Sequence, residues 1–532
     1  MISDIDIHID RDKCIACGEC VDRCIMDNLR LSIAPCRQEC PLNMNCQGYI
    51  KLIAQGKLDE AKQEIKEFLP FASILGRVCH APCEDVCERS DIDGAVHIRA
   101  LKRYLADNNI NSSDMVQAIA PETGKKVVVI GSGPAGLMAA WEIRKKGHSV
   151  TVIEAEKKPG GLLKYGIPGS RLPDSELEQC IQAIKNTGVV FKTSHKLGQE
   201  IQFDQLTSQY DAIVIAIGAG NAAFLDIPGV EHCLDGLSVL NKVNSGEKLT
   251  AGDHVAIIGG GNTAVDVALI YKRMGVPDVK VIYRKSLREL KAFKREIKEA
   301  IEEGVVFENS LAPEAVSMLA DGRFEVELLR SVLKFNSEGE LVHGFEKEEC
   351  RKMIVDQVVL ALGQTFSTQL FPDNLINSQT GLLDIEPKTL QSTVLEKLFV
   401  CGDIIADSKS VVQAFASGKE SAESLNRFLD GESLVWGRDK WQQNGWEKEF
   451  VAGPNRLEGI KRSALKTIAP KERSIDTEME VTLSDEEARQ QAARCMSCGR
   501  SYDLNKTCWY CLPCEIECPT KALTVNIPYL VK

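Results

Sequence analysis

The chain of 532 residues contains twenty cysteines, and thiolates are the side chains in it best suited to bind metal. Ten lie within residues 14–87 and six within 495–518, whereas only four lie between: Cys180, Cys233, Cys350 and Cys401. In a large chain that opens on the acidic segment MISDIDIHID, without a signal-peptide pattern, such cysteines favour metal ligation over disulfides. The distribution predicts metal-binding ends around a cysteine-poor core, whose four thiols we interpret as core or surface residues.

Both ends carry the spacing C-x₂-C-x₂-C-x₃-C, with which bacterial ferredoxins hold four-iron clusters. It occurs at Cys14, Cys17, Cys20 and Cys24, and again at Cys508, Cys511, Cys514 and Cys518, where Pro519 follows. The first copy has Ile25 in place of that proline, which is a small departure. In this spacing three close cysteines wrap one cluster and the fourth often ligates a neighbouring one. The repetition predicts two iron–sulfur clusters.

A glycine-rich loop near residue 130 predicts a first dinucleotide site. The strand-like run KVVVI leads into G-x-G-x-x-G, whose glycines allow a tight turn, close approach to a pyrophosphate and close helix packing. The next strand, SVTVI, ends at Glu154, where a carboxylate can bind ribose hydroxyls. The later PGGLLKYGIPGSRLP is too rich in glycine and proline for a regular element and indicates a loop over the ligand. The residues expected at this site are Gly131, Ser132, Gly133, Pro134, Ala135, Gly136, Glu154, Gly161, Leu162 and Arg171.

A second loop, GGGNTA, repeats this pattern about 130 residues later as G-x-G-x-x-A. The next strand, VKVIY, ends at Arg284, where an NAD site would have an acid, and this cation favours NADP(H). The alternative is that the cations here are ordinary solvated surface. The residues expected at this site are Gly259, Gly260, Gly261, Asn262, Thr263, Ala264, Arg284, Lys285, Arg288 and Gly363.

Strand and helix patterns alternate from Lys126 to about residue 430, which is typical of parallel α/β sheets. We expect two nested Rossmann-like domains, as in two-dinucleotide flavoproteins, with an N-terminal helical iron–sulfur domain and ferredoxin-like cysteine segments at both ends. The outer domain is expected to resume near 355 with MIVDQVVLALG and to close at Gly402 and Asp403. The predicted boundaries are 1–30 and 491–532 for the ferredoxin-like segments, 31–120 for the helical domain, 121–225 with 355–430 for the outer domain, 226–354 for the inner domain, and 431–490 for a linker.

Several motifs together resemble the small (β) subunit of glutamate synthase and its relatives. They are PCRQECP, GRVCHAPCEDVC, AVHIRALKRY, GSGPAG, GGLLKYGIP, GGGNTA, YRKS, ALGQ and CGD, within residues 36–430. The relatives include part of dihydropyrimidine dehydrogenase and the large subunit of electron-bifurcating NADH–ferredoxin:NADP⁺ transhydrogenases. The resemblance implies FAD at the first site, NADPH at the second, and two four-iron clusters in the helical domain. It also implies that Asp403 contacts the flavin and that the helix turn with Gln413 and Ala414 faces its ring.

By position, the resemblance assigns Cys36 and Cys87 to one cluster, and Cys40, Cys79 and Cys83 to the other. The family's R-C-L-x-C pair before Cys36 is absent, but a similar segment, EARQQAARCMSCG, stands near the other end. Where some relatives supply a Glu or Gln ligand, this chain has Lys102, which cannot ligate while protonated.

Setting the four central cysteines aside leaves sixteen, enough for up to four clusters. We hypothesise that Cys495 and Cys498 complete the cluster of Cys36 and Cys87, and that Cys46 completes the other, which requires the two ends of the chain to meet. The alternatives are zinc bound by Cys495, Cys498 and two later cysteines, and Cys46 as an unliganded thiol.

The sequence predicts an NADP(H)-dependent flavoprotein subunit that exchanges hydride between NADP(H) and FAD and passes single electrons through the clusters. No nucleophile constellation stands out, and the core lacks the C-x-x-C of thioredoxin-reductase-like chemistry, so we expect the second substrate on a partner. We rank first a bifurcating transhydrogenase-type complex, with an NADH/flavin subunit and a ferredoxin-like subunit, or soluble ferredoxin, as partners.

Two other functions remain open: the small subunit of NADPH-dependent glutamate synthase, serving its large subunit, and a stand-alone NADPH diaphorase whose ends are structural metal or docking modules. The net charge of −12 and pI of about 5.4 argue against nucleic-acid binding. No run reaches the ~18 apolar residues of a membrane span. We therefore expect a cytoplasmic protein.

Overall fold

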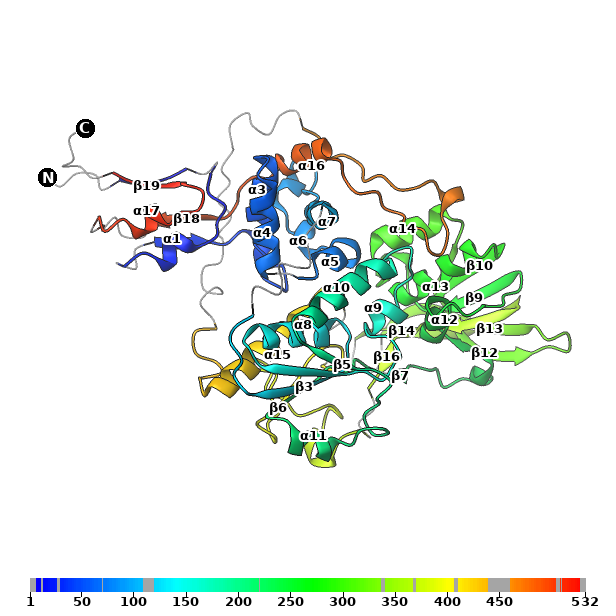
Figure 1. Ribbon diagram of the computed structural model, residues 1–532. Coiled ribbons are helices and arrows are strands. Elements are labelled where there is room, and N and C mark those ends of the chain that lie inside the picture. Colours follow the sequence, from blue (N-terminus) through cyan, green and yellow to red (C-terminus); the bar gives the residue numbers. More distant parts are fainter. Residues whose placement is uncertain are drawn as a thin grey trace.

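The computed structural model describes residues 6–10, 13–25, 29–68, 70–108, 119–219, 221–335, 340–366, 370–405, 410–438, 460–503, 508 and 510–526. Figure 1 shows a unit that holds both chain ends, a helical domain beside it, and two sheet domains beyond. Within the expected linker, residues 439–459 lie outside the described residues. No helix in the described part of the chain is long and apolar enough to cross a membrane.

The outer domain is built on a parallel sheet in the order β17-β6-β3-β4-β5. Its central strands are mostly apolar, as expected for a sheet that helices cover on both faces. The elements are β3 (Lys126–Ile130), α8 (Pro134–Lys145), β4 (Ser149–Ile153), α9 (Leu162–Tyr165), α10 (Asp174–Asn186), β5 (Val190–Lys192), α11 (Phe203–Gln209), β6 (Ala212–Ile215), β17 (Leu398–Val400) and α15 (Val411–Asp430). Helices α8 and α15 pack so closely that a Cβ on Gly418 would lie 2.2 Å from the Ala135 carbonyl oxygen.

The inner domain has a second parallel sheet, in the order β11-β10-β9-β15-β8. Its elements are β8 (Leu234–Asp235), α12 (Gly236–Asn244), β9 (His254–Ile258), α13 (Asn262–Arg273), β10 (Asp278–Tyr283), α14 (Lys294–Glu302), β11 (Val306–Asn309) and β15 (Gln357–Leu360). The expectation that the outer domain resumes at 355 is wrong for this strand, because β15 pairs with β9 and β8. An apolar run fits either sheet, so the pattern alone does not assign QVVL to one of them. The short strands β7 (Asn221–Ala222) and β16 (Gln364–Thr365) pair antiparallel where the chain passes between the two domains.

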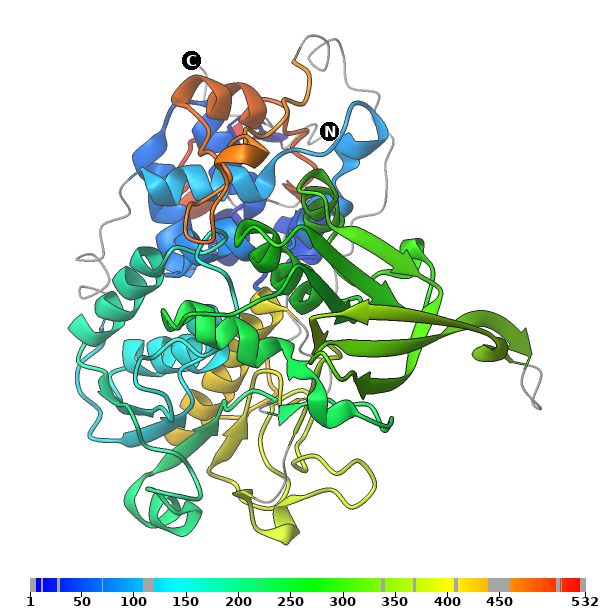
Figure 2. The same cartoon turned by 90° about the vertical axis from the view of Figure 1, so that its right-hand side faces the viewer.

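A three-stranded antiparallel sheet extends from the inner domain. It consists of β12 (Leu311–Met318), β13 (Phe324–Phe335) and β14 (Leu341–Val355). Strand β12 pairs with β13 only as far as Arg330, so β13 and β14 continue as a two-stranded ribbon that projects from the molecule (Figure 2). No pattern in the sequence predicted this sheet.

The helical domain contains α2 (Pro35–Gln38), α3 (Cys46–Ala54), α4 (Leu58–Phe68), α5 (Ala72–Val78), α6 (Pro82–Asp85) and α7 (Ile98–Asp107). Helix α16 (Asp485–Ala492), from the far end of the chain, packs against α3 and α7. Phe71 stacks on Phe415 of α15 with ring centroids 4.6 Å apart, which seats the helical domain on the outer domain.

The two chain ends form one structure, here called the terminal unit. Strand β1 (Asp6–Ile9) pairs antiparallel with β19 (Leu523–Asn526), and β2 (Leu29–Ser32) pairs antiparallel with β18 (Arg500–Asp503). The helical turns α1 (Glu19–Asp22) and α17 (Pro513–Ile516) complete it. The segments expected at 1–30 and 491–532 therefore contribute the two halves of one folded unit, whose elements lie within residues 6–32 and 500–526, and this meets the requirement that the chain ends come together.

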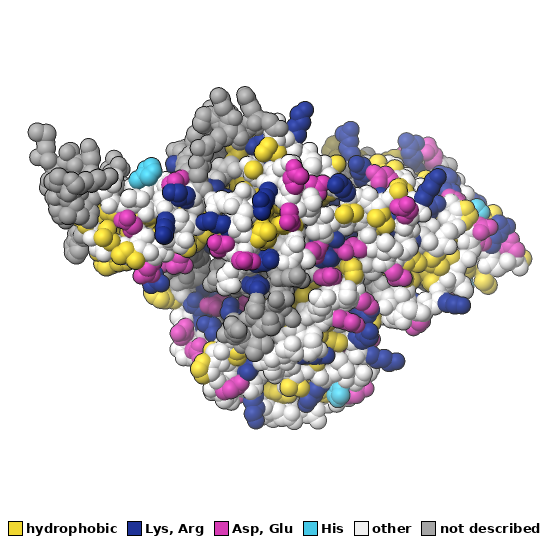
Figure 3. Space-filling view, turned by 45° about the horizontal axis from the view of Figure 1, so that its top comes forward, with side chains coloured by type: hydrophobic (Ala, Val, Ile, Leu, Met, Phe, Trp, Pro, Cys, Tyr) yellow, Lys and Arg dark blue, Asp and Glu magenta, His cyan; other side chains and the backbone are white. Residues whose placement is uncertain are grey.

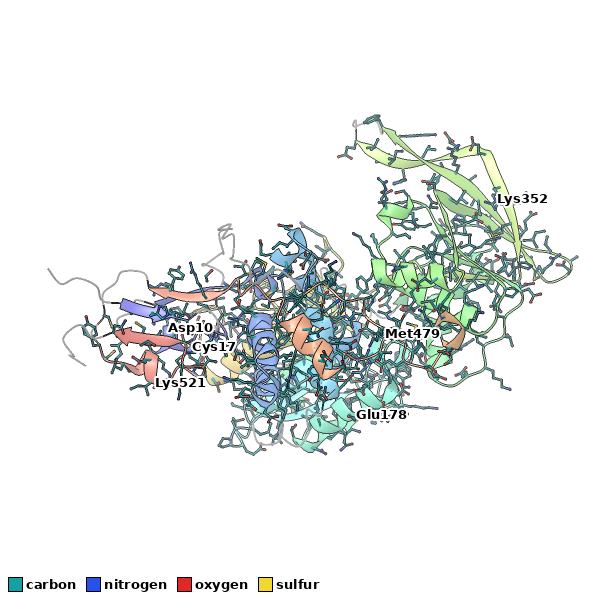
Figure 4. All side chains as sticks on the ribbon, turned by 90° about the horizontal axis from the view of Figure 1, so that it is seen from above. Asp10, Cys17, Glu178, Lys352, Met479 and Lys521 are labelled. Carbon is teal, nitrogen blue, oxygen red and sulfur yellow. The ribbon has the colours of Figure 1, made fainter. Side chains whose placement is uncertain are left out.

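Residues 460–484, here called the strap, lie across three domains (Figure 2). Glu478 pairs with Arg77 of the helical domain at 2.8 Å, and Glu480 pairs with Arg99 at 2.6 Å. The Met479 sulfur accepts a hydrogen bond from Arg273 of the inner domain, and Figure 4 shows Met479 between the helical domain and the inner domain. The second half of the expected linker is thus a packed element, because its acidic residues meet buried arginines.

Candidate cofactor sites

The first glycine loop has the geometry of a phosphate cradle. Gly131 has φ +100°, and a Cβ there would lie 2.3 Å from the Ala216 carbonyl oxygen, so only glycine fits. A Cβ on Gly136 would lie 2.0 Å from the Gly131 oxygen. Gly133, at the N-cap of α8, instead faces open space, with nothing within 4 Å of its Cβ position. The loop thus leaves room where a pyrophosphate approaches a helix N-terminus.

Glu154 ties this loop to the second strand. Its side chain is buried, and its carboxylate accepts hydrogen bonds from the Ser132 amide (2.9 Å), the Ser132 hydroxyl and the Glu156 amide (2.8 Å). The Ser132 hydroxyl also accepts from the Gly160 amide at 2.9 Å. The acid therefore lies beside the loop, and its binding of ribose hydroxyls stays a prediction.

Two more glycines expected at the first site, Gly161 and Gly402, lie against the same loop. A Cβ on Gly161 would lie 2.7 Å from the Gly133 Cα, and one on Gly402 would lie 3.1 Å from the Ala135 Cβ. The Gly402 amide donates to Ser417 Oγ on α15 at 2.9 Å. Pro134 and Ala135 open α8, Leu162 opens α9, Asp403 follows Gly402, and Gln413 and Ala414 lie in the first turn of α15.

Arg171, expected at the first cofactor, lies instead in an ion-pair cluster between the two sheet domains. Its guanidinium donates to both oxygens of Asp266 (2.8 and 2.9 Å) and to Glu296. Burial would lower its pKa, but the two carboxylates raise it above the ordinary value. Both acids lie about a hundred residues away in the inner domain, so no local pattern indicated them.

The second glycine loop repeats the cradle. A Cβ on Gly259 would lie 2.2 Å from the Ala361 carbonyl oxygen, whereas Gly261, at the N-cap of α13, has nothing within 4 Å. Asn262 Oδ1 accepts from the Phe293 amide at 2.9 Å, which fixes the start of α14 beside the loop. Gly260, Thr263 and Ala264 complete the turn, and Gly363 follows β15.

The cations that follow β10 remain available to a ligand. Arg284 and Arg288 are exposed, and neither forms an ion pair with the part of the chain that the structure describes. Lys285 is partly exposed and lies 3.8 Å from Glu289. The three cations lie at the strand end where the sequence places them.

The thiols of the terminal unit gather across the two halves rather than within each. The pKa of Cys20 is raised to about 12, mainly by burial. Its hydrogen bond to Ser501 Oγ (3.1 Å) opposes this increase, and the nearby thiols of Cys14, Cys17 and Cys518 add to it. Burial raises the pKa of Cys514 to about 11, with further contributions from three other thiols, those of Cys24, Cys508 and Cys511. We call the first set the Cys14 group and the second the Cys508 group; each takes its fourth member from the opposite end of the chain.

Two more sets of four thiols lie in the helical domain. The Cys36 group comprises Cys36, Cys87, Cys495 and Cys498: Cys36 interacts electrostatically with Cys495 and Cys498, and each of these with Cys87. The Cys40 group comprises Cys40, Cys46, Cys79 and Cys83. Cys46 is fully buried, and hydrogen bonding to Cys36 and Cys40 raises its pKa, so the two groups adjoin.

Lys102 lies beside the Cys40 group and is 5% exposed. Burial alone would lower the pKa of its ammonium, but its electrostatic interaction with the four thiols raises it. Its position in AVHIRALKRY is visible in the sequence, but its burial among four cysteines is not.

The central thiols lie apart from these groups. Cys401 is buried, Cys180 and Cys233 are partly exposed, and Cys350 is exposed. Among the residues that the structure describes, no three His, Cys, Asp or Glu side chains gather closely enough to hold a single metal ion. The thiols of the four groups therefore lie farther apart than the ligands of a single metal ion would. Zinc at the C-terminal cysteines stays a prediction.

Two protein-family models match the chain. Residues 125–418 match pyridine nucleotide-disulphide oxidoreductase, and residues 6–114 match domain II of dihydropyrimidine dehydrogenase, described as a 4Fe-4S cluster domain. The first match spans both sheet domains, and the second spans the helical domain and the first half of the terminal unit.

Characterised relatives are redox subunits. The chain is 30% identical to the β subunit of NADP(+)-dependent formate dehydrogenase from Moorella thermoacetica, over 88% of this chain and 71% of that one. It is 29% identical to the β subunit of NADPH-Fe(3+) oxidoreductase from Geobacter sulfurreducens (88% and 75%), and 30% identical to the small chain of NADPH glutamate synthase from Azospirillum brasilense (74% and 86%).

A solved structure confirms the fold of the two sheet domains. FprA of Mycobacterium tuberculosis in complex with NADPH superposes with a TM-score of 0.51 over 62% of this chain and 88% of that one, at 17% identity. The nested α/β architecture is therefore as expected. The chain belongs to the pyridine nucleotide-disulphide oxidoreductase family, and within it to the glutamate synthase small chain-like oxidoreductases that join an iron–sulfur domain to nested dinucleotide-binding domains.

Proposed function

We propose that the protein is the NADP(H)- and FAD-dependent electron-transfer subunit of a redox complex, with four iron–sulfur clusters leading from the sheet domains to the terminal unit. The bound cofactors supply hydride and single-electron chemistry, and the chain's residues hold them in position. The open cradles at Gly133 and Gly261 fit a pyrophosphate each, since both leave a helix N-terminus uncovered. Arg284, Lys285 and Arg288 fit a 2′-phosphate at the second cradle.

The serial arrangement of the four thiol groups is the observation that carries this proposal. Arg37 donates to the Ala16 carbonyl at 3.3 Å and interacts with Cys17, Cys36 and Cys46, so it lies between the Cys14 group and the helical-domain groups. Figure 4 shows Cys17 near the helical domain. The Cys508 group draws three of its four thiols from the other half of the terminal unit, and the paired strands join the two halves.

The other end of this series reaches the inner domain. His80 follows Cys79 and stacks on Phe293, with ring centroids 5.2 Å apart and planes 10° from parallel. The Phe293 amide is in turn held by Asn262 of the second cradle. This contact supports an order in which the Cys40 group is the one nearest the dinucleotide sites and the Cys508 group is the farthest along the series. We therefore assign the terminal unit as the place where a partner exchanges electrons.

The ligand grouping is tested by the Cys495→Ser, Cys498→Ser double variant. Protein purified without oxygen should lose about one quarter of its iron and acid-labile sulfide, because one four-cysteine cluster of four is broken. Cys233→Ser, Cys350→Ser is the matched control, since it removes two thiols outside the groups and should leave iron unchanged. Unchanged iron in the first variant would refute the grouping, and zinc in place of iron would support the diaphorase alternative.

The partner is the second part of the proposal. We rank a transhydrogenase-type complex with an NADH/flavin subunit and a ferredoxin-like subunit above glutamate synthase. The glutamate synthase small chain matches 74% of this chain, against 88% for the formate dehydrogenase and Fe(3+) oxidoreductase subunits, so more of this chain has a counterpart in those complexes.

Purification from native cells without oxygen, followed by mass spectrometry of co-purifying chains, tests this ranking. An NADH/flavin subunit with a small iron–sulfur subunit supports the first choice. A large glutamate synthase chain supports the alternative instead.

A further inference from the structure

A buried lysine faces the Cys40 group from the helix that packs against three cysteine-bearing segments. Lys102 is on α7, which packs against α3, α5 and α6. Helix α3 begins at Cys46, α5 ends one residue before Cys79, and α6 contains Cys83. The ammonium interacts electrostatically with all four thiols of the group. Helix packing and side-chain charge thus place one buried cation beside this site.

The other buried cations of α7 have carboxylate partners, and Lys102 has none among the described residues. Arg99 pairs with Glu480 at 2.6 Å, and Arg103 pairs with Asp107 at 3.1 Å. These arginines bind the strap and the end of their own helix. An isolated buried ammonium is strongly unfavourable, as is any unpaired buried ion. The charge that offsets this cost must therefore come from the thiol site.

Two neighbouring cations, Lys51 and Arg37, contact other parts of the helical domain and the terminal unit. Lys51 of α3 donates to the Cys14 carbonyl at 3.3 Å and interacts with Cys495, so it lies at the Cys36 and Cys14 groups. Arg37 donates to Asn43 Oδ1 at 3.1 Å and to the Ala16 carbonyl. Lys102, in contrast, interacts with all of Cys40, Cys46, Cys79 and Cys83.

We propose that Lys102 is the counter-cation of the iron–sulfur cluster held by the Cys40 group and that it raises the reduction potential of this cluster. The inference rests on the proposed function for the existence of the cluster. Reduction adds one electron and one negative charge to the site, without making or breaking a bond. A fixed positive charge in a low-dielectric interior stabilises that added charge. The cluster nearest the dinucleotide sites would then accept an electron more readily than it would without the lysine.

The test is a potentiometric titration with dithionite as the electron donor, followed by the electron paramagnetic resonance of the reduced clusters. Lys102→Met removes the charge at similar side-chain length, and Lys102→Arg retains it. Lys57→Met is the matched control, because Lys57 is exposed in the same domain and its loss is the same change in charge. The signal of the Cys40 group is the one that disappears in Cys79→Ser.

In Lys102→Met this signal should titrate at a more negative potential. We expect at least a tenfold fall in the equilibrium constant for reduction, which is about 59 mV for one electron. The Arg variant should titrate near the wild type, and Lys57→Met should not move. Loss of this cluster in the Met variant with retention in the Arg variant would also support the proposal, because it shows that the charge is required.

Two results would overturn the inference. One is an unchanged potential in Lys102→Met. The other is loss of the cluster in both Lys102 variants, which would make the lysine a packing residue. The proposed function fails in a different way: Cys79→Ser would then lose neither iron nor any resonance.

Discussion

Arg284 and Arg288, after β10, are where we expect NADPH to be distinguished from NADH. A hydrogen bond to a charged group contributes roughly 1.5–3 kcal/mol, so Arg284→Ala or Arg288→Ala should raise KM for NADPH about tenfold or more. KM for NADH should change little, because NADH lacks the 2′-phosphate. Steady-state dye reduction with each nucleotide measures the difference.

Arg330→Ala is the control for this pair, since Arg330 is also exposed in the inner domain but pairs with Glu349 at 2.8 Å. It should alter neither KM. Equal increases for both nucleotides in the Arg284 and Arg288 variants would mean that these arginines do not read the 2′-phosphate.

Glu296 should make stability depend on pH. Its side chain is 1% exposed, and burial raises its pKa from 4.5 to about 7 although Arg171 lowers it. Between pH 4.5 and pH 7 the folded state holds this proton more tightly than the unfolded chain, so its contribution to stability falls as pH rises. The melting temperature of Glu296→Gln relative to wild type should therefore rise from pH 5 to pH 8. A constant difference would show that Glu296 does not titrate in this range.

At the scale of elements, replacing Gly133 and replacing Gly136 should have different effects, although both residues lie in one loop: the first on FAD binding and the second on stability. Gly133→Ala adds a methyl group to open space at φ −66°, so the protein should fold normally but bind FAD more weakly. Gly136→Ala forces the methyl group against the Gly131 oxygen and should destabilise the outer domain by about 1–3 kcal/mol. FAD content and thermal unfolding separate the two. Normal FAD content in a stable Gly133→Ala protein would place the pyrophosphate elsewhere.

The sequence was sufficient to predict elements whose signal is local. The glycine loop after KVVVI and the cysteine spacings lie within about thirty residues, and both are where they were expected. Strand β15 and the strap are not where they were expected, because the position of each depends on partners far along the chain. QVVL fits any parallel sheet, and Glu478 and Glu480 look like linker residues until they meet Arg77 and Arg99.

At the scale of the molecule, Cys518 tests whether electrons leave through the terminal unit. In Cys518→Ser the cluster of the Cys14 group should be lost, because that group takes its fourth thiol from the other half. NADPH-dependent reduction of a small dye should persist, since both cradles are intact, whereas reduction of the co-purified partner should fall sharply. Equal rates with the partner would place the electron exit elsewhere.

The sequence predicts that the two ends of the chain meet, but it does not predict how they pair to form the terminal unit. The cysteine arithmetic needs Cys495 and Cys498 near Cys36, and the structure places them together. The exchange of Cys24 and Cys518 between halves depends on the register of β1 with β19 and β2 with β18, which no local pattern encodes. The same is true of Arg171, whose partners lie in the other sheet domain.

Most thiol groups combine cysteines from both ends of the chain, and this determines the order in which their ligand sets are completed during synthesis. Only the Cys40 group draws all its thiols from the first hundred residues; the other three need cysteines from 495–518. While the ribosome is still making the sheet domains, those three sites lack at least one ligand. On the proposed ligand grouping, iron delivered by the cell's assembly machinery would be fully ligated at one site during translation, and at the other three only after the last segment has emerged and the two ends have paired.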